Sequence, residues 1–346
     1  MNRIAVTFLT VIVMLMTPLI LSAQSGEPPV SYMNRVFTAF DQTKTDTWQY
    51  LKAVTKGKSA FGIENKRRDL LKEMQKAKAE VQKIGNYHGD DSLKSVVVDY
   101  LDLSYKVLKE DFDKILDMEE IAEQSYDLME AYLLAKEKAN EKLNESYENV
   151  VQAQRDFAKK YNITLVEAET DKITAKIEKA SSTLKYYNEL YLIFFKSYKQ
   201  EAYVLDAMDR NDISAFEQNI GTLSLYSNEG LERLATFENY QGDPNLKTYA
   251  KKALTFYKTE AENDFPSLTN YFIKKDSFEK IKKEFESISE SKRTQQDIDQ
   301  FNDAVNEFNE VAQNANTVLK TGNTKRQKML NEWNTAVDNF FTKHAE

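Results

Sequence analysis

Cysteine is absent from this chain of 346 residues, and only two histidines occur, His88 and His344. The first absence excludes disulfides, thiolate metal sites and cysteine nucleophiles. The second leaves no visible cluster of His with carboxylates for zinc or general-base chemistry. An active site also needs a convergent nucleophile, base and orienting group, and the sequence offers no such set. We therefore name no catalytic, metal-ligating or cofactor-binding residue, expect no cofactor, and predict that the protein is not an enzyme.

Glycine and proline are scarce, with 9 and 5 residues, and neither occurs between Gly89 and Gly221. Only long helices tolerate such a gap. Apolar residues recur at the spacing of one helix face, as in Leu70, Met74, Ala77, Val81 and Ile84. No stretch shows the sustained alternation of a strand. We predict an all-α fold, a long-helix bundle built from two tandemly duplicated helical units plus a C-terminal helix.

A long apolar run is present only at the N-terminus. Residues 4–21 are largely apolar, follow Met1-Asn2-Arg3, and precede the small residues Ser22 and Ala23. This order is typical of a signal peptide, 1–23, that is cleaved after Ala23. The alternative is a membrane anchor, because the run approaches the ~20 residues of a spanning helix. With no cysteine at the cleavage point, a lipid-anchored lipoprotein is excluded, and we expect an extended leader over 24–30 and export to the periplasm or cell surface.

An excess of positive charge is also lacking. The chain has 47 basic and 55 acidic residues, and cleavage removes Arg3, which leaves a mature net charge of −9. Nucleic-acid-binding proteins carry a basic surface, so we expect no nucleic-acid partner. Past the signal, the longest wholly apolar run is Leu190 to Phe195. That run is far too short for a bilayer, so we expect no transmembrane anchor after signal cleavage.

The most informative feature that is present is a repeat. Residues 86–94 (NYHGDDSLK) match 239–247 (NYQGDPNLK) at six of nine positions, with an offset of 153. Upstream, Ser59-Ala60-Phe61 matches Ser214-Ala215-Phe216 after a length change of two residues. We infer an ancient tandem duplication, with helical unit 1 at 31–162 and helical unit 2 at 163–346.

Several helix ends are predicted from local signals. Asn162 fits a left-handed helix terminator, and Thr164 with Glu167 fits a capping box that would start a bridging helix reaching about Asp209. Asp243 fits an N-cap with Pro244 at the first helical position. Gly322 is expected to end one helix before the extra C-terminal helix, about 324–343.

The two repeated turns are the first candidate site. In each, the glycine can supply a positive φ, the aspartate can cap the next helix, and the tyrosine can pack over the turn. This structural role accounts for the residue types, and the alternative is a pair of equivalent loops that bind a ligand or partner. The residues are Asn86, Tyr87, Gly89, Asp90, Asn239, Tyr240, Gly242 and Asp243.

The second candidate is an aromatic stretch of the bridging helix. A helix that is apolar around much of its circumference is normally buried, so we expect a core. The alternative is a pocket for a small apolar or sugar-like ligand between helices. The residues concerned are Tyr186, Tyr187, Tyr191, Phe194, Phe195 and Tyr198.

Residues 295–317 are rich in Asn, Gln, Asp and Glu, with apolar residues at helical spacing. This pattern predicts a polar-faced amphipathic helix, which suits packing within the chain or binding of a partner helix. The sequence does not discriminate between these two uses.

A signal ending in Leu21-Ser22-Ala23-Gln24, the lack of cysteine, duplicated long helices and the Asn-Tyr-x-Gly-Asp turns resemble an uncharacterised family of Sec-exported, all-helical surface or periplasmic proteins of Gram-negative bacteria. The resemblance implies a location outside the inner membrane and lends no activity and no functional residue. We predict a non-enzymatic binding or scaffold module with a protein partner in the cell envelope. The alternative is a soluble receptor for a small apolar or aromatic ligand held in the Tyr/Phe-rich bundle core.

Overall fold

The computed structural model describes residues 17–18, 26–57, 59–111, 121–166 and 171–345. These residues are helical almost throughout, which confirms the predicted all-α class. The predicted signal peptide and the start of the leader lie outside the described residues, apart from positions 17 and 18.

Two short strands are the exception to the helical fold. Strand β1 (Thr17–Pro18) pairs antiparallel with β2 (Leu165–Val166), with Thr17 opposite Val166. Because each strand has only two residues, the pair adds no sheet layer to the described residues.

Contacts between residues divide the chain into two compact units. The first unit comprises 1–189 with 338–346, and the second comprises 190–337. Both limits fall inside long helices, α7 (Lys172–Asp209) and α11 (Gln295–His344). The sequence-based boundary after residue 162 follows the repeat rather than the contacts, and it stays a prediction.

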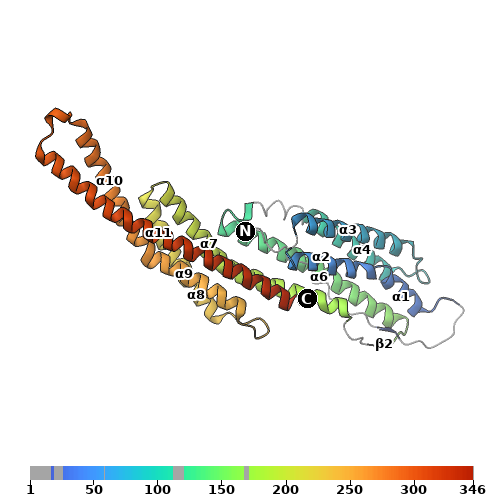
Figure 1. Ribbon diagram of the computed structural model, residues 1–346. Coiled ribbons are helices and arrows are strands. Elements are labelled where there is room, and N and C mark those ends of the chain that lie inside the picture. Colours follow the sequence, from blue (N-terminus) through green and yellow to red (C-terminus); the bar gives the residue numbers. More distant parts are fainter. Residues whose placement is uncertain (1–16, 19–25, 58, 112–120, 167–170, 346) are drawn as a thin grey trace. The chain divides into compact units, whose positions relative to one another are not determined.

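The first unit is a bundle in which α2, α3, α4 and α6 pack one on the next in chain order (Figure 1). On α3, the helical spacing predicted a buried stripe, and its residues Leu70, Met74, Ala77 and Val81 are at most 3% exposed. The π-helix η1 follows α4 directly, and Leu108 within it accepts a hydrogen bond at 2.9 Å from Arg67. The helices are α1 (Pro29–Thr38), α2 (Asp41–Thr55), α3 (Ala60–Lys83), α4 (Ser92–Lys106), η1 (Val107–Asp111) and α6 (Tyr126–Lys160).

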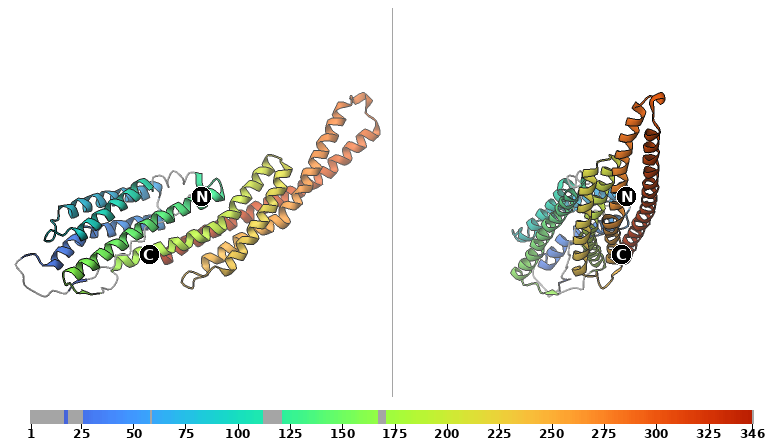
Figure 2. Two further views of the ribbon diagram at one scale, coloured as in Figure 1. Left: turned by 180° about the vertical axis from the view of Figure 1, so that it is seen from behind. Right: turned by 90° about the vertical axis from the view of Figure 1, so that its left-hand side faces the viewer.

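In the second unit, α8 packs against α9, and α9, η2 and α10 follow one another without a break. After a turn at η3, α11 runs back along α10, so that the two helices form a hairpin (Figure 2). The elements are α8 (Ile213–Thr236), α9 (Asn245–Thr259), the π-helix η2 (Glu260–Asp264), α10 (Phe265–Ser287) and the 3₁₀ turn η3 (Glu290–Lys292).

Helices of the two units begin and end at equivalent positions. Helices α3 and α8, α4 and α9, and η1 and η2 have equal lengths and are offset by 153 residues at both ends. This constant offset pairs Phe61 with Ser214, so the predicted pairing of Phe61 with Phe216 is wrong. Burial agrees, because Phe61 is 72% exposed whereas Phe216 is in the core. The common origin of the two segments stays a prediction.

The C-terminal helix differs from the prediction. Helix α11 runs without interruption from Gln295 to His344, so Gly322 does not end a helix and no separate helix begins near 324. The end of α11 also repeats features of α6, with Phe340 buried like Phe157 and Lys343 matching Lys160, at an offset of 183. This offset is thirty residues more than 153.

Of the other predicted helix ends, the one at Asn162 agrees with the structure and three differ from it. Asn162 has the expected positive φ of 56° after α6. The bridging helix does not start at Thr164, because α7 begins at Lys172, and Glu167 of the predicted capping box lies outside the described residues. Asp171 Oδ1 accepts from the first amides of α7, Ile173 N at 2.9 Å among them. Pro244 is the N-cap rather than the first helical residue. The leader also ends earlier than expected, since α1 starts at Pro29.

Candidate functional site

The first repeated turn has the predicted backbone. The amide of Tyr87 donates to the carbonyl of Asp90 at 2.9 Å, and the amide of Asp90 donates back at 2.8 Å. Gly89 has a φ of 86°, a conformation that glycine adopts without strain. Asp90 Oδ1 accepts from the amide of Ser92, the first residue of α4, at 2.9 Å. The N-cap of α4 is Asp91, so Asp90 lies one residue before the predicted capping position.

The other carboxylate oxygen of Asp90 ties the turn to the end of α6. Oδ2 accepts from Lys160 Nζ at 2.7 Å and from the Tyr161 hydroxyl at 2.9 Å. Burial alone would raise the pKa of Asp90, but the hydrogen bonds from Lys160, Ser92 and Tyr161 outweigh it and hold the pKa well below its usual value. Asp90 is therefore an ionised structural anchor.

Tyr87 packs over this turn among other rings. Its centroid lies 5.1 Å from that of Tyr32, 5.7 Å from Phe157 and 4.8 Å from Tyr161. Its hydroxyl donates to the Glu27 carbonyl at 3.1 Å. The Tyr87 ring and hydroxyl and both carboxylate oxygens of Asp90 therefore have structural partners, which fits the structural interpretation.

The second turn has the same backbone. Asp243 N donates to the Tyr240 carbonyl at 2.9 Å, Gly242 has a φ of 77°, and Asp243 Oδ1 accepts from the amide of Asn245 at 2.9 Å. Tyr240 is half-buried, whereas Tyr87 is 8% exposed. That the two turns form a paired epitope stays a prediction.

The aromatic residues of α7 lie in the cores of both units. Tyr187, Tyr191, Phe194 and Phe195 are buried, and Tyr186 and Tyr198 are half-buried. In the first unit, the ring centroids of Tyr187 and Phe341 lie 5.0 Å apart. In the second, Phe194 stacks on Trp333 at 4.5 Å.

Ring-on-ring packing of this kind is what the core interpretation predicted. The three cavities described in the chain are lined by other residues. That these aromatic residues hold a small ligand stays a prediction.

The second unit contains a buried ionic cluster that the sequence did not reveal. Arg326 Nε donates to Glu201 Oε1 at 2.5 Å, and its Nη2 donates to Glu260 Oε1 at 2.8 Å. The side chains of Glu201 and Glu260 are 3% and 2% exposed. One arginine thus stands between two carboxylates from α7 and η2.

The cluster has two carboxyl groups, Glu201 and Glu260, and only one cation, Arg326. Its buried Oε2 accepts no hydrogen bond from any described donor. Burial raises the pKa of Glu260 most strongly, its hydrogen bond and repulsion with Glu201 raise it further, and Arg326 only partly opposes them. The raised pKa favours the protonated form of the Glu260 carboxyl group in the folded protein.

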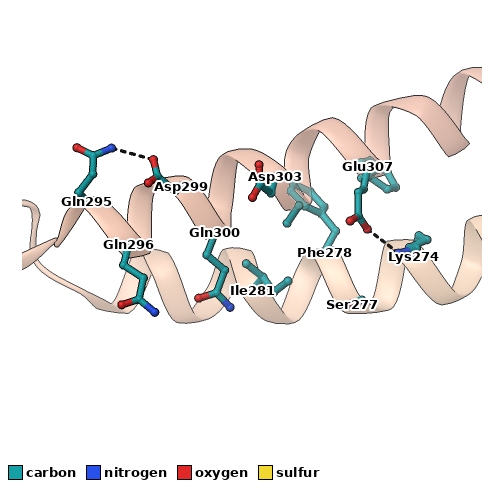
Figure 3. A pocket seen from close by; sticks show the side chains of 12 residues that line it. Lys274, Ser277, Phe278, Ile281, Gln295, Gln296, Asp299, Gln300, Asp303 and Glu307 are labelled. Carbon is teal, nitrogen blue, oxygen red and sulfur yellow. Dashed lines mark hydrogen bonds and ion pairs between the residues drawn. The ribbon is translucent and has the colours of Figure 1, made fainter.

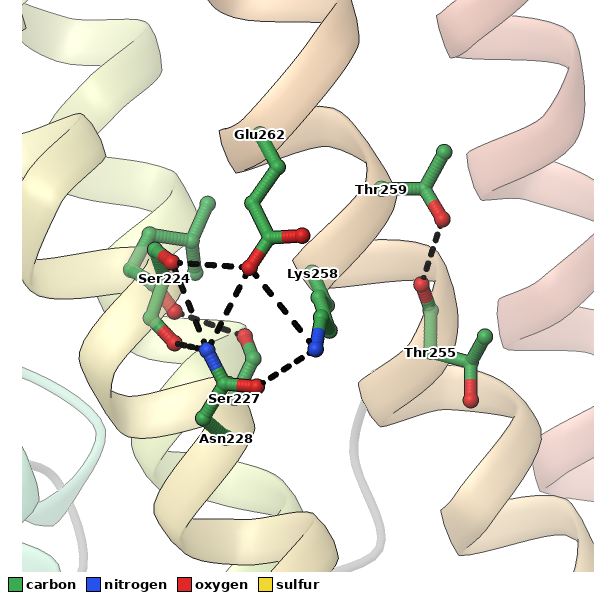
Figure 4. Close-up of polar contacts among 8 residues, drawn as sticks. Ser224, Ser227, Asn228, Thr255, Lys258, Thr259 and Glu262 are labelled. Atoms are coloured by element: carbon green, nitrogen blue, oxygen red, sulfur yellow. Dashed lines mark hydrogen bonds and ion pairs between the residues drawn. The ribbon is translucent and has the colours of Figure 1, made fainter.

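On the other side of η2 lies a polar network that faces α8 (Figure 4). Glu262 Oε1 accepts from Ser224 Oγ at 3.2 Å and from Asn228 Nδ2 at 3.3 Å. Lys258 Nζ donates to Asn228 Oδ1 at 2.7 Å and lies 3.8 Å from Glu262. Glu260 of η2 thus points inward to Arg326, and Glu262 points toward α8, so η2 makes polar contacts on both sides.

The largest cavity described is an open groove of about 600 Å³ along the α10–α11 hairpin (Figure 3). Its apolar residues are Phe278 and Ile281 of α10 and Ala304 and Phe308 of α11. Polar residues of α11 form its wall, and Lys274 on α10 pairs with Glu307 at 2.5 Å.

Stacked rings hold the hairpin together. Phe278 stacks on Phe308 at 4.8 Å with an interplanar angle of 2°, and Phe285 stacks on Phe301 at 4.4 Å and 7°. All four rings are only half-buried. A pair of helices can shield only one side of such a seam, so the other side remains in contact with solvent.

Comparisons with family models, with curated proteins and with solved structures find no match to this chain. Along the described ranges, no helix has both the length and the apolar composition needed to cross a bilayer. The functional argument therefore depends on the chain's own geometry.

The seam and the ionic cluster differ in how much of each the sequence shows. The amphipathic character of 295–317 was predicted, whereas its pairing with α10 and the ionic cluster were not. Phenylalanines recur seven residues apart at Phe278 and Phe285 and again at Phe301 and Phe308, so the paired seam could have been found from spacing. The ionic cluster had no local signal. Arg326 lies 125 residues from Glu201 and 66 from Glu260, and all three stand in ordinary charged helical sequence.

Proposed function

We propose that the protein is an exported, non-enzymatic binding or scaffold protein of the cell envelope, and that the α10–α11 hairpin is its contact element. One observation carries this proposal, namely the half-buried aromatic seam bordering an open groove. Apolar surface that remains accessible along a helix pair is typical of a surface that binds another helix.

Export and location are supported by the sequence. The N-terminal order of Arg3, an apolar run and Ser22-Ala23 fits a cleaved signal peptide, and the resemblance to exported helical proteins agrees with it. The repeated helix bounds support a tandem duplication, in which the second copy gained the hairpin as extra length.

Site-specific photo-crosslinking tests the contact element. A photoreactive amino acid replaces Ile281, which lines the groove, and in a second variant it replaces Leu225, which is 55% exposed on α8. In cells of the source organism, we expect one defined protein adduct from position 281 and none from position 225. The adduct is identified by mass spectrometry.

Position 225 is the control for nonspecific crosslinking at exposed apolar residues. Equal adducts from both positions would mean that any exposed apolar residue is labelled, and the absence of an adduct at 281 would contradict the role of the hairpin. Circular dichroism of both variants checks that the helical fold is retained.

A further inference from the structure

The groove wall on α11 is acidic. Asp299, Asp303 and Glu307 follow one another at intervals of four residues, so they lie on one face of the helix, and all three line the groove (Figure 3). Glu307 pairs with Lys274, and Asp299 accepts from Gln295 at 2.8 Å. In the described part of the chain, no lysine or arginine pairs with Asp299 or Asp303.

The acidic character extends along this half of α11. Residues 295–319 contain five acidic residues and no lysine or arginine. Such a one-sided distribution is uncommon in a chain with 47 basic residues. It leaves the wall negative at Asp299 and Asp303, whereas Lys274 balances Glu307. A negative wall attracts cations and raises the association rate of a positively charged partner.

The floor of the groove is apolar. Phe278, Ile281 and Phe308 are half-buried and lie between the two helices. Side chains at this spacing accept the apolar stripe of a third helix, which would complete a three-helix bundle. From Gln295 to Phe308 the wall is about 20 Å long at 1.5 Å per residue, which matches three to four turns of a helix.

We infer that the groove binds an amphipathic α-helix of a partner protein, with an apolar stripe for the Phe278–Phe308 floor and Lys or Arg residues beside it for Asp299 and Asp303. This inference rests on the proposed function, because it names the partner chemistry of the same hairpin. The charge of the wall discriminates between partners, since an acidic helix would bring like charges together.

Two synthetic peptides of eighteen residues test the charge requirement. Both place Leu on one helical face, and the other face carries Lys in the first peptide and Glu in the second. Binding to the full mature protein is measured by fluorescence anisotropy with a labelled peptide. We expect the Leu/Lys peptide to bind, with an affinity that falls as the salt concentration rises, and the Leu/Glu peptide not to bind.

Two double variants, one in the groove and one outside it, test whether the peptide binds in the groove. In the Asp299→Asn, Asp303→Asn double variant we expect the affinity for the Leu/Lys peptide to fall about two- to thirtyfold, because two exposed ion pairs at ~0.2 to 1 kcal/mol each are lost. The control is Glu279→Gln with Glu286→Gln, two exposed carboxylates of α10 outside the groove lining, which should leave the affinity unchanged.

The other outcomes distinguish a wrong partner chemistry from a wrong proposed function. Equal binding of both peptides, or equal loss in both double variants, would overturn the inference and leave the hairpin as a contact element. So would a dimer in analytical ultracentrifugation that the Asp299/Asp303 variant abolishes, because the occupant would then be a second copy. If neither peptide binds while position 281 still yields an adduct, only the partner chemistry falls; if position 281 also yields none, the proposed function falls as well.

Discussion

At the scale of single residues, Glu260 departs furthest from the behaviour of a solvated carboxylate. It is 1% exposed, stands beside Glu201, and shares Arg326 with that second carboxylate. Its pKa is raised above the usual 4.5, so the folded protein holds a proton that the unfolded chain releases. Stability therefore falls as the pH rises above about 4.5 toward the raised pKa.

We predict that Glu260→Gln removes this pH dependence. The amide oxygen can still accept from Arg326, and the group no longer has to hold a proton. In the original protein the free energy of unfolding should fall by up to about 1.4 kcal/mol per pH unit between pH 5 and about 9, and in the variant this contribution should be absent. Urea denaturation at several pH values measures both slopes.

The control for this prediction is Glu262→Gln, two residues away but on the outer side of η2. It should keep the slope of the original protein. Identical slopes in the original protein and in Glu260→Gln would show that Glu260 is ionised in the fold.

Asp90 shows the opposite electrostatic situation. Its lowered pKa means that its contribution to stability is present above its unfolded pKa of about 3.8 and is lost as the pH falls toward the lower folded value. Because Lys160 is 58% exposed, most of the stabilisation comes from Tyr161 and the Ser92 amide rather than from the ion pair.

We predict that Asp90→Asn lowers the free energy of unfolding by about 1 to 2 kcal/mol at pH 7. The difference from the original protein should narrow as the pH falls below about 3.8, where the carboxylate becomes protonated. Thermal denaturation followed by circular dichroism measures the effect. Asp91→Asn is the matched control, because Asp91 is exposed and makes no side-chain cap; an equal loss there would contradict the anchoring role of Asp90.

At the scale of elements, two helical glycines provide a direct comparison. Gly221 in α8 is exposed, and a Cβ there would meet nothing within 4 Å, whereas a Cβ at Gly322 in α11 would lie 3.3 Å from Glu260 Oε1. Glycine costs ~1 kcal/mol relative to alanine inside a helix. The absence of a side chain at Gly322 therefore makes room for the buried carboxyl of η2.

We predict that Gly221→Ala stabilises the protein by about 0.5 to 1 kcal/mol and that Gly322→Ala gains less or destabilises. The measurement is the midpoint of urea denaturation for the two variants side by side. An equal gain at both positions would mean that Glu260 moves away from the new methyl group without cost.

The same scale explains which helix ends could be predicted. Asn162 and the turn glycines were found because a left-handed residue is a local requirement of the backbone. Gly322 was misread as a helix end because its role depends on a neighbour 62 residues earlier in the chain. The capping box at Thr164 was also chemically reasonable, but it is Asp171 that accepts from the first helical amides of α7, those of Ile173 and Thr174.

At the scale of the whole molecule, the predictions concern export and state of assembly. A signal peptide cleaved after Ala23 gives a mature chain of residues 24–346 with a net charge of −9. We expect a native mass spectrum of protein isolated from its own cell envelope to show this chain, alone or in a defined complex. The full-length mass would contradict cleavage, and extra small-molecule mass at a fixed ratio would favour the alternative of a ligand receptor.

The amino-acid sequence by itself determined the helical class, the two Asn-Tyr-x-Gly-Asp turns and the repeat, because apolar spacing and positive φ act over a few residues. Only the tertiary structure decided that Glu260 is buried beside Glu201 and Arg326, and that the seam of the α10–α11 hairpin stays half open. Burial, and the pKa values and binding surfaces that depend on it, arise from contacts between distant residues. Local periodicity shows which face of a helix is apolar, whereas packing decides what covers that face.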